Sequence, residues 1–216
     1  MLGELASDRG VTLAEVTVVL LVVSVLAGVA APSAKRAIDR AKLARVVTDE
    51  SAIKTAITNF LSDFTAFTPF TSNGTTTGSV TVETIVSDGD ISRDTCSGTS
   101  CASWQALVTN NTATGTVDFI ERQLVTNTPE GGATGYATGS PGWRGAYLNA
   151  PIDPDPWGNR YAVNVKFLRT DTTKDVIVLS AGPDEVIDTA YDKDGITPGG
   201  DDIISVVRRD VGLTTP

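Results

Sequence analysis

The stretch Gly10-Val-Thr-Leu-Ala-Glu15 leads directly into the apolar run Val16-Thr-Val-Val-Leu-Leu-Val-Val-Ser-Val-Leu-Ala-Gly-Val-Ala-Ala31, which stops at Pro32. The apolar run contains no charged residue. A helix over residues 11–31 would be about 31 Å long, which is enough to cross a bilayer. Glu15 lies inside the N-terminal end of this helix. An ionisable group at that depth is costly and therefore indicates a function.

Three interpretations of residues 1–32 are open. A removable secretory signal peptide would use the small residues 29–31 for cleavage, but the first ten residues lack a positive excess and a Glu in the apolar run is atypical. A plain membrane anchor leaves Glu15 without a role. The third interpretation is a signal that is cut after Gly10, so that the apolar run stays in the mature protein.

Composition limits the function classes. The chain has 216 residues, 41% of them hydrophobic, which leaves room for one ordinary soluble domain beyond the apolar run. A net charge of −9 argues against a general nucleic-acid binder. The absence of His excludes Ser-His-Asp and Cys-His catalysis and His-ligated zinc. Asp153 and Asp155 could suggest carboxylate catalysis, but they are interleaved with Pro in a turn. Because the sequence has no His and no nucleophile motif, we expect that the chain is not an enzyme.

Hydrophobic periodicity predicts the fold. Helical spacing continues past Pro32 to about residue 64, and the apolar positions that would pack on a sheet are Ile53, Ala56, Ile57, Phe60, Leu61 and Phe64. Residues 161–165, 175–179 and 203–207 predict antiparallel strands. We therefore expect an α+β fold in which a long N-terminal helix packs on a small antiparallel β-sheet.

The chain divides into four segments by composition. Residues 1–10 form a leader, and residues 11–64 form the long helix, with its hydrophobic part at 11–32. Residues 65–140 are a variable polar region, and residues 141–216 form a C-terminal β-sheet with an acidic loop. Within the polar region we expect a strand at 80–86 and short helices at 103–107 and 117–124.

Two features bear on the compartment. Cys96 and Cys101 bracket Ser-Gly-Thr-Ser, which indicates a local disulfide in an oxidising compartment, with a pair of free thiols as the alternative. The basic residues between Lys35 and Arg45 would place the C-terminal side in the cytoplasm by the positive-inside rule. We interpret them as a solvated or headgroup-facing surface, because the cysteine pair and the acidic C-terminal tail favour an extracytoplasmic domain.

The stretch over residues 10–32 resembles the prepilin cleavage and methylation motif of type IV pilins and type II secretion pseudopilins. That family usually has Gly, Phe, Thr, Leu, an aliphatic residue and Glu, followed by an apolar helix broken by a proline, as at Pro32. Here Val11 replaces Phe, and Ala14 replaces a larger aliphatic residue. The resemblance implies that a prepilin peptidase cuts between Gly10 and Val11 and N-methylates the new α-amine.

The same resemblance implies a role for the buried carboxylate. In a filament, Glu15 would face the free α-amine of Val11 on a neighbouring subunit. A paired charge is tolerable in a low-dielectric core where an unpaired one is not. A subunit out of register would bury Glu15 without a partner, so the pair would fix the register.

A second block resembles the major pseudopilin of type II secretion. Trp143-Arg-Gly-Ala-Tyr-Leu148 and Asp155-Pro-Trp-Gly-Asn-Arg-Tyr161 are similar to its W-R-G-x-Y-L and D-P-W-G-N-x-Y stretches. That family also has a Ser-x-Gly-x-Asp stretch and a paired-Asp stretch before the last strand, which together bind calcium. Matched residue by residue, the resemblance implies a calcium site formed by the side chains of Asp184, Asp201 and Asp202 and the carbonyl of Ala181.

The connection over residues 186–198 is longer than in that family. It adds Asp188, Asp192 and Asp194, of which the last two lie in an Asp-Lys-Asp-Gly run that resembles a fragment of an EF-hand loop. These three residues could join the calcium site, form a second site or be solvated. The alternative to any metal is an acidic surface loop.

The resemblance covers residues 10–64 and 141–207. It implies a structural subunit that polymerises with itself into a periplasmic pseudopilus for type II secretion, aided by an inner-membrane assembly platform and minor pseudopilins. The precursor would cross the inner membrane once with its C-terminal domain in the periplasm, and would then enter a periplasmic or surface filament. The alternatives are a type IV pilin for adhesion, motility or DNA uptake, and a membrane-anchored or secreted calcium-binding enzyme.

Overall fold

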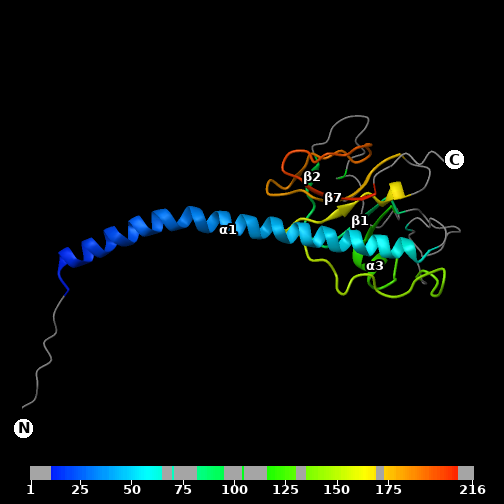
Figure 1. Cartoon of the computed structure of the whole chain (residues 1–216), viewed down its shortest axis with the longest axis horizontal. Helices are drawn as coiled ribbons and strands as arrows, with labels where there is room; N and C mark the ends of the chain where they lie inside the picture. Colours follow the sequence, from blue (N-terminus) through cyan, green and yellow to red (C-terminus); the bar gives the residue numbers. More distant parts are fainter. Residues whose placement is uncertain are drawn as a thin grey trace, which may run out of the picture. The chain divides into compact units, whose positions relative to one another are not determined.

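The computed structural model describes residues 11–64, 70, 82–94, 104, 116–129, 135–168 and 173–208. The chain divides into two compact units, Met1–Leu43 and Ala44–Pro216. Helix α1 (Leu13–Ser62) contributes to both units (Figure 1).

In the first unit, the described residues after Thr12 form the N-terminal part of α1. Pro32 lies inside this helix and does not end it. Proline has no N–H to donate to the preceding turn, so one helical hydrogen bond is lost there while the residues on both sides stay helical. The apolar run stops at Pro32, as the sequence indicates, but the helix continues.

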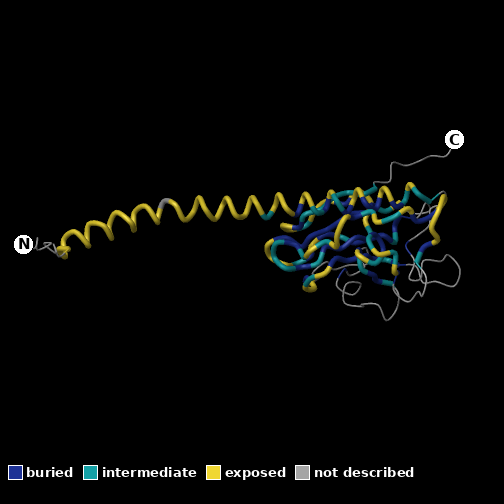
Figure 2. Tube along the Cα trace, turned by 90° about the horizontal axis from the view of Figure 1, so that it is seen from below, coloured by how far each residue is buried: buried dark blue, intermediate teal, exposed yellow. Residues whose placement is uncertain are grey.

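The second unit is built around the C-terminal part of α1. Its predicted apolar positions are confirmed, because Ile53, Ala56, Ile57 and Phe60 are buried and Leu61 and Phe64 are partly buried against the same core. Val46, seven residues or about two helical turns before Ile53, is also buried, whereas Val47 is 59% exposed. Figure 2 shows the buried residues of this unit gathered beside the helix.

The main sheet has five strands in the order β3-β1-β4-β5-β7. In chain order they are β1 (Thr84–Val86), β3 (Val117–Phe119), β4 (Ala162–Val163), β5 (Val176–Ser180) and β7 (Ile203–Arg208). Strand β5 pairs on both sides, with β4 and β7, and all five of its residues are buried. A strand that is covered on both faces requires a continuous apolar run, which Val176-Ile-Val-Leu179 supplies.

The expectation of an antiparallel sheet holds for only part of the sheet. Strands β1, β4, β5 and β7 pair antiparallel, but β3 pairs parallel to β1, so the five-stranded sheet is mixed. A second sheet joins β2 (Arg93–Asp94) and β6 (Val186–Ile187), also in parallel. The fold is α+β, with one long helix and a small mixed sheet.

One predicted helix is partly wrong. Residues 117–124 form strand β3 followed by the short helix α3 (Ile120–Leu124), because the first three residues pair with β1. The predicted strand at 80–86 is confirmed over Thr84–Val86. The helix expected at 103–107 lies outside the described residues except for Trp104, which is buried and donates its indole N–H to the Thr189 carbonyl at 2.9 Å.

The 143–148 block packs aromatic rings against the C-terminal end of α1. The ring centroids of Trp143 and Tyr147 lie 6.3 Å and 5.5 Å from that of Phe60. The Tyr147 hydroxyl also donates to Asp63 Oδ2 at 2.9 Å. A short 3-10 helix, η1 (Val165–Leu168), follows β4 and adds Phe167 to the core.

Candidate functional sites on the N-terminal helix and the C-terminal acidic loop

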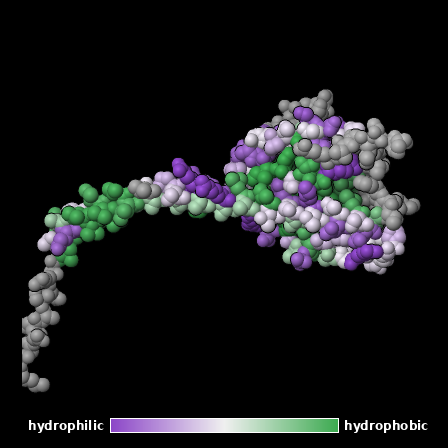
Figure 3. All heavy atoms as spheres, in the orientation of Figure 1, coloured by the Kyte–Doolittle hydropathy of each residue, from purple (hydrophilic) through white to green (hydrophobic). Residues whose placement is uncertain are grey.

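The N-terminal part of α1 exposes a continuous apolar surface. Every Val and Leu side chain from Val11 to Leu26 is exposed, from 45% at Val16 to 85% at Leu13. Figure 3 shows this surface as apolar along the helix. Removing one such side chain from water is worth about 1.5–3 kcal/mol. By length and composition the helix can cross a membrane, so a bilayer or partner helices are the surroundings that its surface fits.

Glu15 is held by a capping box at the start of α1. Its Oε2 accepts hydrogen bonds from the backbone N–H and from Oγ1 of Thr12, both at 2.9 Å, and its own N–H donates to Thr12 Oγ1 at 3.3 Å. Thr-x-x-Glu is the sequence signature of this arrangement. The interpretation of Glu15 as a costly ionisable group that indicates a function did not use that signal. Among the described residues, no hydrogen bond reaches the second oxygen, Oε1.

The predicted processing point lies just before the helix. Gly10 is outside the described residues, while Val11 is 74% exposed and precedes the first helical residue, Leu13. A peptidase needs a non-helical, accessible peptide bond. The capping box uses the Thr12 N–H, which would survive a cut between Gly10 and Val11.

The structure brings two of the three predicted calcium ligands together. The pKa of Asp201 is raised, first by burial and then by the adjacent Asp184 carboxyl, through a hydrogen bond and its charge. Asp184 also accepts a hydrogen bond from the Val186 N–H at 2.9 Å, which holds its side chain over the loop. Two carboxyls in contact repel one another when both are ionised, and a cation between them would relieve that repulsion.

Gly182 allows the two halves of this loop to approach. Its φ is +68°, and a Cβ at this position would lie 2.4 Å from the Asp201 carbonyl oxygen. Any larger residue would therefore push the 181–184 and 201–202 segments apart. Ala181, the predicted carbonyl ligand, is fully buried at the start of the same turn.

Asp202 forms its hydrogen bonds with Asp188 and Thr189. Its Oδ2 accepts hydrogen bonds from the Asp188 N–H at 2.9 Å and from the Thr189 N–H and Oγ1 at 2.7 Å and 2.6 Å. Burial raises the pKa of Asp202 to about 6. Its Oδ1 is buried without a hydrogen-bond partner. Asp202 therefore anchors the long connection to the start of β7.

The predicted calcium set thus fits a cation in part. The carboxyls of Asp184 and Asp201 are in contact. Asp202 is the next residue in the chain, but its carboxylate accepts a hydrogen bond from Thr189. Within the part of the chain that the structure describes, no group of three acidic or other metal-ligating side chains converges. Of the three further acids, Asp188 donates its backbone N–H to Asp202, Asp192 is half-buried, and Asp194 is exposed.

Asp155 stabilises a turn through hydrogen bonds. It is 3% exposed; its Oδ1 accepts from the Trp157 and Asn159 N–H groups at 3.0 Å and 2.9 Å, and its Oδ2 accepts from Ser180 Oγ at 2.7 Å. These bonds hold the Asp-Pro-Trp-Gly-Asn turn against the end of β5. Asp153 is exposed and lies 4.0 Å from the Arg45 guanidinium.

Sequence reasoning missed Glu50, a buried carboxyl on α1. It is 1% exposed, and its Oε1 has no hydrogen-bond partner. Burial raises its pKa to about 8, against a hydrogen bond from the Ser180 backbone that lowers it. The helical spacing of Val46, Glu50 and Ile53 was the available signal for its burial. Cys96 and Cys101, the predicted disulfide, lie outside the described residues.

No protein-family model, curated protein or solved structure matches the chain.

Proposed function

We propose that the chain is a pilin-like filament subunit, similar to the major pseudopilin of type II secretion, that assembles through the N-terminal part of α1. In this proposal a prepilin peptidase removes residues 1–10 and N-methylates Val11. The precursor crosses the inner membrane once, with its C-terminal unit in the periplasm. The mature chain then polymerises with copies of itself, aided by an inner-membrane assembly platform and minor pseudopilins.

The observation that carries the proposal is the combination of Glu15 with the exposed apolar helix. A segment that exposes eleven Val and Leu side chains between Val11 and Leu26 must be covered by lipid or by other helices. In a bilayer the Glu15 carboxylate has no charged partner, whereas next to another subunit it can pair with the free α-amine of that subunit. The capping box leaves Oε1 of Glu15 without a hydrogen bond from the described residues, and this oxygen can accept one from such an amine.

The acidic loop has a supporting role in the proposal. Calcium between Asp184 and Asp201 would hold the 181–184 turn against the start of β7, and so fix the shape of that surface for subunit contacts. Oxygen ligands from carboxylates and backbone carbonyls suit this hard cation. The chain itself would act by assembly, without catalysis.

The test separates the charge of Glu15 from its capping bonds. Glu15→Gln keeps a capping acceptor but removes the charge, and Thr12→Val weakens the cap but keeps the charge. If charge pairing drives assembly, Glu15→Gln and Glu15→Val insert into the membrane but form few filaments. Thr12→Val still forms them. Membrane fractionation and electron microscopy of sheared filaments give the two readouts, and normal filaments from Glu15→Val would contradict the proposal.

A further inference from the structure

Asp175 is a buried carboxylate at the start of β5 that no predicted role explains. It is 1% exposed. Its N–H donates to the Lys193 carbonyl at 3.3 Å, and its Oδ2 accepts from the Ile196 N–H at 2.9 Å. These two bonds place the Asp175 side chain against the turn over residues 192–196.

Each of the two segments that these bonds join carries one carboxylate oxygen without a hydrogen-bond partner. These oxygens are Oδ1 of Asp175 and Oδ1 of Asp192, and both are buried. A buried oxygen that carries negative charge and has no donor is strongly unfavourable, so such atoms require a proton donor or a cation. Lys193, the one basic residue of the turn, is exposed and forms no ion pair with either carboxylate in the described structure.

The backbone around these oxygens is fixed. The Asn164 side-chain N–H2 donates to the carbonyls of Asp175 and Tyr191 at 3.0 Å and 2.8 Å, and its Oδ1 accepts from the Ile177 N–H at 2.8 Å. Asn164 thus ties the start of β5 to the residue before Asp192. Gly195, at φ +63°, turns the chain back so that the Ile196 N–H reaches Asp175.

We propose that Asp175 and Asp192 form a site for a hard divalent cation of the calcium class, bound by their two unpartnered Oδ1 atoms. Backbone carbonyls of the turn and water would complete the oxygen shell. Calcium accepts six to eight oxygens in flexible geometry, which suits a donor set drawn mainly from one turn. The ion would fasten the long 186–198 connection to β5.

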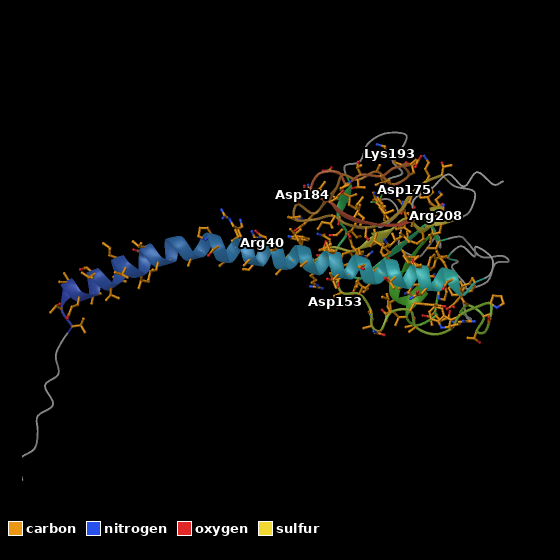
Figure 4. The ribbon with its side chains drawn as sticks, in the orientation of Figure 1. Arg40, Asp153, Asp175, Asp184, Lys193 and Arg208 are labelled. Atoms are coloured by element: carbon orange, nitrogen blue, oxygen red, sulfur yellow. The ribbon has the colours of Figure 1, made fainter. Side chains whose placement is uncertain are left out.

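This site is separate from the Asp184 and Asp201 pair. Asp175 precedes β5 and Asp184 follows it, and a five-residue strand spans about 16 Å. Calcium ligands lie at about 2.3–2.6 Å from the ion, so one ion cannot serve both places. Figure 4 shows Asp175 close to Lys193 and well apart from Asp184. The inference does not depend on filament assembly.

Calcium titration of the full chain in detergent, after chelation, tests the site. Isothermal titration counts bound ions, and thermal unfolding with and without calcium measures the stabilisation. Asp192→Ala is the main variant because Asp192 is only half-buried, and Asp175→Asn is the second because it keeps the buried volume. Asp184→Asn is the matched control, since it removes an acid of the same loop at the other place.

We expect Asp192→Ala and Asp175→Asn each to lose one calcium equivalent that Asp184→Asn retains. At about a hundredfold excess over Kd, calcium should raise the unfolding temperature of the Asp184→Asn chain by roughly 5 °C or more. That shift should disappear when Asp192→Ala is added. The proposal is overturned if folded Asp192→Ala binds as many ions as the unmutated chain, with the same affinity. It is also overturned if the Asp184→Asn chain binds none, in which case water satisfies the two oxygens.

Discussion

Replacing Glu50 by Gln should remove a pH-dependent loss of stability. Glu50 is buried on α1, and its Oε1 has no hydrogen-bond partner. Burial raises its pKa from 4.5 to about 8. Gln has the shape of the protonated carboxyl and cannot ionise, so Glu50→Gln should behave like the unmutated chain at low pH.

The sign and size follow from linkage. Between pH 4.5 and about 8 the folded chain keeps a proton on Glu50 that the unfolded chain has released, so the free energy of unfolding falls as pH rises through this window. One pKa unit is worth about 1.4 kcal/mol, so the full loss is on the order of 5 kcal/mol above about pH 8. Burial also raises the pKa values of Asp118 and Asp202, from 3.8 to about 6. These two groups lower the free energy of unfolding further as pH rises from 3.8 to about 6.

Urea denaturation of a fragment over residues 35–216, followed by Trp fluorescence, provides the assay. Near pH 5 the two proteins should be similar in stability, and near pH 8.5 Glu50→Gln should be more stable by several kcal/mol. The Asp118 and Asp202 contributions are present in both proteins and cancel in the difference. Equal pH dependence of the two proteins would show that Glu50 does not keep its proton in the folded chain.

Two further predictions concern the second unit. Phe60→Ala should lower the free energy of unfolding by about 3–5 kcal/mol in the same assay, because Phe60 is fully buried among rings that include Phe64 and Tyr147; a change under about 1 kcal/mol would contradict this packing. A chelator should lower the thermal unfolding temperature. Asp184→Ala should remove the part of that effect owed to the Asp184 and Asp201 pair, and no chelator response in the unmutated chain would exclude calcium.

The parts of the fold that sequence predicted are those with a strong local period. The stripe from Ile53 to Phe60 has helical spacing, and β5 is a continuous apolar run bounded by acids and turn residues. The parallel pairing of β3 with β1 was missed, because it joins segments about thirty residues apart whose alternation is short. Pairing of this kind depends on tertiary contacts that local propensity does not encode.

The candidate sites divide in the same way. The capping box at Thr12 and Glu15 was present as a four-residue pattern and needed only to be recognised. Asp202 was expected to face Asp184, but its side chain satisfies the N–H groups of Asp188 and Thr189. Orientation within a loop of Asp and Gly residues is set by backbone turns, and the sequence shows the residues without those turns.

Intact-mass analysis of the mature chain from its native host shows whether the apolar helix stays in the protein as its assembly element. If the leader ends at Gly10, the mature chain begins at N-methylated Val11 and carries Glu15. A mature chain that begins near Ala31, without the apolar helix, would contradict the assembly role of that helix.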